Sequence, residues 1–117
     1  MSGTIQLEIV TPSKVLLDKS VELVVIPGSE GLFGVLPKHS DLLANLKMGI
    51  VEVHESGKII DRIAINGGIA DVNATKVTIL AQFAEDINKS SSKDIKDKLI
   101  TMEGEEKAFF EGIINLI

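Results

Sequence analysis

The segment from Gly28 to Gly49, GSEGLFGVLPKHSDLLANLKMG, holds residue types that could do chemistry. His39 and Asp41 could serve a small hydrolase as base and carboxylate, or bind a metal ion as two of its ligands. A hydrolase also needs a nucleophile, and Ser29 lacks the strained G-x-S-x-G turn that exposes one. A metal site needs a third ligand, and nothing nearby in the sequence supplies it. The segment therefore predicts no catalytic residue and no metal ligand.

The glycines of this segment could suggest a phosphate-binding loop, because Gly28, Gly31 and Gly34 recur every third residue. A phosphate loop opens a helix, whose free N–H groups face the anion. Here the glycines lead into Val35 and Pro37, which favour extended chain. We therefore predict that the glycines serve tight turns and bulges, and that the chain binds no cofactor.

Length and charge limit what this chain can be. Its 117 residues suffice for one compact domain with a modest appendage. The net charge is −5 and the only arginine is Arg62, so we expect no nucleic-acid partner. The absence of cysteine excludes disulfides and thiolate metal sites. The sequence shows no signal peptide and no apolar run of the ~18 residues that span a bilayer, so we expect a soluble intracellular protein.

Residues 1–86 show the pattern of short β-strands. In the run TIQLEIV, the residues Ile5, Leu7 and Ile9 alternate with polar ones, which predicts one buried face. Four further runs are rich in β-branched residues, namely VELVVI, GIVEVHE, KIIDRIAI and KVTILAQ. Short strands at this spacing predict an antiparallel sandwich or a flattened barrel.

Turn signals lie between these runs. Ser56-Gly57 and Asn66-Gly67 each predict a tight hairpin, with a positive φ at Gly67. His54 precedes the first of these turns within the alternating run VEVHE. We predict that it is a solvated strand residue rather than a base.

Residues 87–117 differ in character and predict a hairpin of two short helices. Ser91 or Ser92 can cap the first helix, and Gly104 separates it from the second. Both helices carry apolar residues at helical spacing, at Ile95, Leu99 and Met102 and then at Phe109, Ile113, Leu116 and Ile117. Helices this short are marginal in water, so the hairpin must dock on the sandwich or on a partner.

Apolar residues crowd the glycine-punctuated stretch that we expect to be a loop, at Leu32, Phe33, Val35 and Leu36. Loops usually lie at the surface, and an exposed apolar cluster often marks a partner site. Alternatively, Phe33 and Leu36 fold inward and plug the end of the sandwich. The sequence leaves both possibilities open.

Several motifs, found in a fixed order, carry a resemblance to a known family. They are IPGSEGLFGVLP at residues 26–37, His39, Leu42-Leu43, Leu46-Lys47, Gly49, INGGI at 65–69, Val72, VTILA at 77–81 and Ala84-Glu85. On these motifs the chain resembles the epsilon subunit of bacterial F-type ATP synthases, the counterpart of the mitochondrial delta subunit. The resemblance implies a mainly β fold with a small α part. A ten-stranded β-sandwich would occupy residues 1–86, and a short two-helix hairpin would occupy residues 87–117.

The resemblance also implies a function and partners. The chain would be a non-catalytic rotor subunit of the central stalk that links the gamma subunit to the c-ring and couples proton translocation to ATP synthesis. The implied contacts with the c-ring are Ser29, Glu30, Gly31, Leu32 and Phe33, and those with gamma are His39, Leu42 and Ala44. The C-terminal helices would reach the alpha and beta subunits and regulate ATP hydrolysis weakly. The expected location is peripheral, on the cytoplasmic side of the bacterial inner membrane.

Two departures from the family pattern refine these expectations. Leu32 stands where many relatives carry Glu, which predicts a more apolar contact with the ring. Some relatives bind ATP through an I/L-D-x-x-R-A pattern, and the matching region here, SSSKDIKDK, has no Arg. Lysine does not replace Arg in a planar, bidentate phosphate contact. We therefore predict weak or absent ATP binding, and a hairpin that rests on the sandwich with Phe109 and Ile113 covered.

Two other functions compete with this interpretation. A free-standing sandwich that binds a small ligand would place aromatic or convergent polar groups in a pocket, and aromatic residues make up only 3 % of the chain. A hydrolase based on His39 and Asp41 would lose turnover on His39→Ala. Recovery of gamma in a pull-down would separate the rotor subunit from both alternatives.

Overall fold

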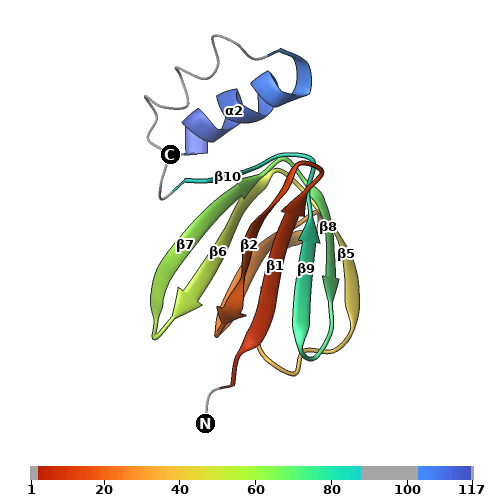
Figure 1. Cartoon of the computed structure of the whole chain (residues 1–117), viewed down its shortest axis with the longest axis vertical. Helices are drawn as coiled ribbons and strands as arrows, with labels where there is room; N and C mark the ends of the chain where they lie inside the picture. Colours follow the sequence, from red (N-terminus) through yellow and green to blue (C-terminus); the bar gives the residue numbers. More distant parts are fainter. Residues whose placement is uncertain (1–2, 88–102, 117) are drawn as a thin grey trace.

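The computed structural model describes residues 3–87 and 103–116, and these ranges contain ten β-strands and one α-helix (Figure 1). The elements are β1 (Ile5–Thr11), β2 (Lys14–Val21), β3 (Leu23–Gly28), β4 (Gly31–Val35), β5 (Leu42–Leu46), β6 (Gly49–Glu55), β7 (Lys58–Ile65), β8 (Gly68–Val72), β9 (Lys76–Leu80), β10 (Ala84–Asp86) and α2 (Gly104–Leu116). The mainly β class with a small α part is as predicted. The predicted first helix, around residues 91–102, lies outside the described residues.

The strands form two layers. They follow one hydrogen-bonded path, β10-β7-β6-β3-β5-β8-β9-β1-β2, with β4 paired to β3 beside the path. The path folds between β3 and β5, which share a single paired position, Gly28 with Leu46. One layer therefore holds β10, β7, β6, β3 and β4, and the other holds β5, β8, β9, β1 and β2. Among the described strands, β1 and β9 form the one parallel pair.

Aliphatic side chains fill the space between the layers. Ile5, Leu7 and Ile9 are buried, as the alternation in β1 predicted. Ile26 on β3 and Ile79 on β9 bring the two layers into the same cluster. Each fully buried side chain of this size contributes roughly 1.5–3 kcal/mol, so this core dominates the stability of the sandwich.

One of the two predicted hairpin turns is confirmed. β6 and β7 pair up to Glu55 and Lys58, so Ser56 and Gly57 are the two turn residues. Both have positive φ, 51° at Ser56 and 77° at Gly57. Two consecutive positive φ values match the right-handed twist of a two-residue hairpin, which explains the glycine.

The hairpin predicted at Asn66-Gly67 is wrong. β7 pairs with β6 and β10, whereas β8 pairs with β5 and β9, so this link carries the chain from one layer to the other. Gly67 does have the expected positive φ, 121°. The Asn66 side chain fixes the crossing by accepting a hydrogen bond from the backbone N of Phe83 over 3.0 Å. A turn signal specifies local φ values, which a layer crossing can need as much as a hairpin does.

Helix α2 lies across one end of the sandwich, above β10 in Figure 1. It packs through a separate apolar cluster, which we call the helix seam and which consists of Ala64, Ile87, Phe109, Phe110 and Ile113. The rings of Phe83 and Phe109 stack with centroids 5.9 Å apart, and those of Phe109 and Phe110 meet edge to face at 5.2 Å. The predicted burial of Phe109 and Ile113 is thus found, and the surface that covers them belongs to β7 and to the residues around β10.

Two polar contacts close the sandwich. Lys19 Nζ on β2 lies 2.5 Å from Asp61 Oδ2 on β7, which joins the two layers near the ends of the strand path. The Asp61 side chain is largely buried, so this ion pair is poorly screened by solvent. The backbone N of Ser56 donates to Glu22 Oε1 over 2.9 Å and ties the β6–β7 turn to the link between β2 and β3.

Candidate functional site

The stretch that was expected to be a loop is a β-hairpin. β3 and β4 pair in register up to Gly28 and Gly31, so Ser29 and Glu30 alone form the turn, which we call the hairpin tip. The prediction of a loop from Leu32 to Val35 is therefore wrong. Gly28 is required because a Cβ there would lie 2.9 Å from the ring of Phe33, on the facing strand. Gly28 thus lets the Phe33 ring lie directly against the backbone of β3.

The apolar residues of β4 divide between solvent and core. Leu32 is 70 % exposed, whereas Phe33 is half-buried and packs against the core. Strand geometry accounts for this, since successive side chains point to opposite faces. Leu36, just beyond β4, is 59 % exposed. Of the two residues that the sequence allowed to fold inward, Phe33 packs against the core and Leu36 does not. Leu32 remains available to a partner.

The hairpin tip and β5 line one shallow hollow of about 350 Å³. Leu42 and Ala44 reach it from β5, opposite Phe33. Leu43, which belongs to a family motif but was not among the implied contacts, also lines it and is 72 % exposed. Two consecutive exposed leucines at one strand end were the signal for it. Most of the residues implied as contacts therefore come together here, although the resemblance assigned them to two different partners.

His39 does not belong to this group. It lies in the connection between β4 and β5, whose Lys38 donates its backbone N–H to the carbonyl O of Ala74 over 2.9 Å. Leu42, at the start of β5, pairs with Val72, which lies close to Ala74 in the sequence. Leu46, at the other end of β5, pairs with Gly28 beside the hairpin tip. His39 is therefore separated from the hairpin tip by the length of β5, and the implied gamma-facing set extends beyond the hollow.

Neither histidine has surroundings typical of a catalytic base or a metal ligand. The Nδ1 of His39 donates to the carbonyl O of Ser40 at 2.6 Å, so this nitrogen is used locally. His54 is on β6, as predicted, and is half-buried rather than fully solvated, with its Nε2 3.3 Å from Glu52 Oε1. Within residues 3–87 and 103–116, no three His, Asp or Glu side chains gather in a way that could hold a metal ion.

Another hollow lies at the end of the sandwich opposite α2. Its volume is about 510 Å³, and Leu23, Leu36 and Pro37 form its apolar wall. Glu22 and His54 also line it, although Glu22 already accepts the hydrogen bond from Ser56. The part of the chain that the structure describes contains no helix long and apolar enough to cross a membrane.

Comparisons with known proteins match this architecture. The family model described as "ATP synthase, Delta/Epsilon chain, beta-sandwich domain" matches residues 4–87. The ATP synthase epsilon chain of Paramagnetospirillum magneticum is 38 % identical over 84 residues, which are 72 % of this chain and 63 % of that protein. This chain therefore spans less than two thirds of that relative. The ATP synthase epsilon chain of Campylobacter lari is 40 % identical over 99 residues, which are 85 % of this chain and 76 % of that one.

A solved structure is also similar. It belongs to the Euglena gracilis mitochondrial ATP synthase, in a structure described as OSCP/F1/c-ring in rotational state 1. The TM-score is 0.68 at 27 % sequence identity, and the match covers 92 % of this chain and 73 % of that one. The likeness thus extends beyond the residues that the family model matches.

Proposed function

This chain belongs to the family of ATP synthase delta and epsilon chains, and on that premise we propose that it links the gamma subunit to the c-ring as a non-catalytic subunit of the central stalk. The observation that carries the proposal is the extent of the family match, because residues 4–87 include the ten strands that the structure describes. The similarity to a chain from a structure that contains F1 and a c-ring supports it. In this role the chain couples proton translocation to ATP synthesis by turning with the rotor.

The contact with the c-ring is made by the hairpin tip and β4. Ser29 and Glu30 are exposed at the tip, Gly31 follows, and Leu32 extends from β4 with most of its surface in solvent. Phe33 supports this surface from below by packing against the core and against Gly28. An exposed leucine beside a carboxylate suits a partner that offers an apolar groove with polar ends.

The contact with gamma uses Leu42 and Ala44 on β5, with His39 as a more distant point of attachment. Leu42 and Ala44 share their hollow with the hairpin tip, so the two partners would meet on this chain. His39 keeps its Nε2 edge for a partner, because Nδ1 is engaged with Ser40. The chain would reach the cytoplasmic side of the bacterial inner membrane only through these partners, as a peripheral protein.

The C-terminal hairpin would regulate ATP hydrolysis weakly. Contact with the alpha and beta subunits would require α2 to leave the helix seam, where Phe109, Phe110 and Ile113 are buried. Exposing three such side chains costs several kcal/mol, at about 1.5–3 kcal/mol for each. The docked position of α2 is therefore its resting position. Because the C-terminal region lacks the Arg of the ATP-binding pattern, it offers ATP no side chain for a bidentate phosphate contact.

Reconstitution with gamma and c-ring from the same organism tests the proposal. We expect the chain to copurify with both, and Leu32→Asp to weaken attachment to the ring by at least about tenfold, since an unpaired carboxylate is costly to bury. Ile59→Asp is the matched control, because Ile59 is similarly apolar and is exposed on β7. Failure of the unmodified chain to bind either partner would refute the function. Equal binding of the two variants would refute the ring contact alone.

A further inference from the structure

Met48 joins the sandwich to α2 at a point next to the helix seam. It lies in the short connection between β5 and β6, and its side chain reaches Gly112 inside α2. A Cβ at Gly112 would overlap Met48 Cε and lie 3.0 Å from Sδ, so the thioether lies directly on the backbone of the helix. Gly112 precedes Ile113 of the helix seam, and Ile50 on β6 packs against the same cluster.

Met48 is open to solvent as well as to α2. It is 38 % exposed, although its methyl group lies against Gly112. It is the only methionine within residues 3–87 and 103–116, since Met1 and Met102 lie outside these ranges. Hydroperoxides oxidise the methionine thioether to a sulfoxide, and reductases reverse the change. Small peroxides can therefore reach Met48 while α2 stays docked.

The backbone on both sides of Met48 is held in place. The N–H of Lys47 donates to the carbonyl O of Pro27 over 3.0 Å. Gly49 pairs with Ile65 on β7, and a Cβ at Gly49 would lie only 2.8 Å from Cβ of Pro27. The connection therefore has little freedom to move away from α2, and a change in the Met48 side chain acts on the helix contact itself.

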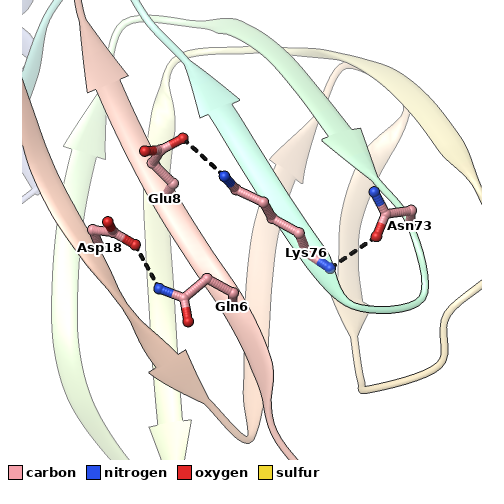
Figure 2. Close-up of polar contacts among 5 residues, drawn as sticks. All are labelled: Gln6, Glu8, Asp18, Asn73 and Lys76. Carbon is pink, nitrogen blue, oxygen red and sulfur yellow. Dashed lines mark hydrogen bonds and ion pairs between the residues drawn. The ribbon is translucent and has the colours of Figure 1, made fainter.

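A polar atom placed in this contact finds no partner on Gly112. On the outer face of the sandwich, polar side chains pair with one another. Figure 2 shows Gln6 Nε2 donating to Asp18 Oδ1 at 2.5 Å. It also shows Lys76 Nζ, which lies 3.4 Å from Glu8 Oε1. Gly112 has no side chain, and an N–H inside an α-helix is already bonded within the helix. An oxygen on Sδ would therefore be unpaired against this part of α2, which is costly.

We propose that Met48 is an oxidation site for hydroperoxides and that its sulfoxide weakens the docking of α2. A lone pair of Sδ attacks one peroxide oxygen, the O–O bond breaks, and the departing hydroxide takes the remaining proton and leaves as water. The sulfur loses two electrons and the peroxide gains them. A sulfoxide reductase reverses the step, with two thiols oxidised to a disulfide and the sulfoxide oxygen released as water.

The sulfoxide loses the contact with Gly112 in either of two ways. If the side chain stays in place, its oxygen is desolvated against the helix, and if it turns into water, the apolar contact is gone. Because a flexible methionine can turn outward, the effect lies at the lower end of the cost of an unpaired polar group, at about fivefold in the opening equilibrium of α2. This inference concerns the chain alone and does not depend on the proposed function.

Two variants of the full chain separate Met48 from the other internal methionine. Met102→Leu keeps Met48, whereas Met48→Leu replaces it with an apolar side chain of similar volume that peroxide does not oxidise. Each is treated with hydrogen peroxide, and peptide mass spectrometry locates the added oxygen. Hydrogen exchange of the amides from Phe109 to Ile113 then reports the opening of α2, because so short a helix is marginal once undocked.

We expect oxidation to speed this exchange about fivefold in Met102→Leu and to leave Met48→Leu unchanged. Sulfoxide reductase with a thiol should restore the original rate. The matched control adds Ile59→Met to a chain carrying both leucine substitutions, because Ile59 is 46 % exposed at the other end of β7 from Ala64 of the helix seam. Its oxidation should not change exchange in α2.

Three results would overturn the inference. The first is an unoxidised Met48 under conditions that oxidise the methionine introduced at position 59. The second is complete oxidation of Met48 with unchanged exchange in α2. The third is equal acceleration in Met48→Leu or in the control, which would assign the effect to oxidation elsewhere in the chain.

A substitution tests the polarity of the side chain without any oxidant. Met48→Gln places an amide oxygen close to the position of the sulfoxide oxygen, and it should speed exchange in α2 about as much as oxidation does. Met48→Leu should keep the rate of the unmodified chain. Equal exchange in these two variants would overturn a polar group at this contact as the cause of release.

Discussion

The core of the sandwich and the helix seam solve the same packing problem with different side chains. Between the layers the chain uses almost only aliphatic residues, such as Ile26 and Ile79, and Phe33 touches this core from its margin. The helix seam gathers Phe109 and Phe110, with Phe83 packed against it. The β-branched residues fit a pleated surface at close range, while large rings cover area with few side chains.

The two regions also differ in what they depend on. Core side chains come from strands throughout residues 5–81, so the sandwich closes around its own interior. The helix seam joins one helix to surface that the sandwich has already built, at Ala64 and around β10. The sandwich should therefore remain folded without α2, whereas α2 should not keep its position or its buried side chains without the sandwich.

The largest effect is expected at Gly68, on the layer crossing. A Cβ there would approach the carbonyl O of Leu80 to 2.1 Å, and φ is 135°. Gly68→Val should lower the free energy of unfolding by more than about 4 kcal/mol and release α2 at the same time. Gly57→Ala is the control, since Gly57 has φ 77° and open space, and it should cost only about 1 kcal/mol. Urea unfolding measures the stability of both variants. Equal midpoints would contradict a larger steric cost at Gly68 than at Gly57.

A pair of truncations tests the asymmetry directly. Ile79→Ala should destabilise the sandwich by about 2–5 kcal/mol through the cavity it leaves. Phe109→Ala should release α2 to protease while changing the unfolding midpoint of the strands by much less. Hydrogen exchange on β1 and β9 separates the two effects. A common loss of protection in Phe109→Ala would show that the helix and sandwich unfold as one unit.

A smaller effect is expected for the ion pair between Lys19 and Asp61. Asp61→Asn should cost about 1–2 kcal/mol, since the carboxylate is mostly buried while the lysine is partly solvated. Lys19→Met completes a double-mutant cycle, in which the coupling energy should be positive and α2 should stay docked. A coupling energy of zero would mean that the pair contributes nothing to holding the layers together.

The smallest effect is expected at Gly112 in α2. A Cβ there would meet Cε of Met48, the mobile end of a flexible side chain. Gly112→Ala gains about 1 kcal/mol of helix propensity and loses a similar amount by displacing Met48, so stability should change by less than about 0.5 kcal/mol. Met48→Ala should make the same substitution stabilising. If Gly112→Ala alone releases α2, the seam fits more tightly than a flexible methionine would allow.

The sequence predicted local features well and long-range pairing poorly. The burial of Ile5, Leu7 and Ile9 followed from alternation within one strand, and the Ser56-Gly57 hairpin followed from two adjacent residues. The Asn66-Gly67 hairpin was wrong because the same backbone requirement serves a layer crossing. Which strands become neighbours depends on the whole chain.

The candidate sites follow the same pattern. The exposure of Leu32 was within reach of the sequence once β4 was recognised as a strand with alternating faces. The line of outward apolar residues across β2, β1, β9 and β8 was not, because each of these strands contributes a single such residue that is unremarkable on its own. Only the register brings Val10 beside Leu80 and Val15. The separation of His39 from the hairpin tip likewise depends on how β5 pairs at its two ends.

The ring contacts of the helix seam give the protein an intrinsic spectroscopic signal for the docking of α2. The chain has no Trp and no Tyr, so phenylalanine is the only aromatic chromophore among its side chains. Three of the four phenylalanines, Phe83, Phe109 and Phe110, meet where α2 docks, and they hold fixed mutual orientations. Near-ultraviolet circular dichroism depends on such fixed orientations. Its fine structure should therefore weaken strongly when α2 undocks, leaving the contribution of Phe33, even while the strands of the sandwich remain folded.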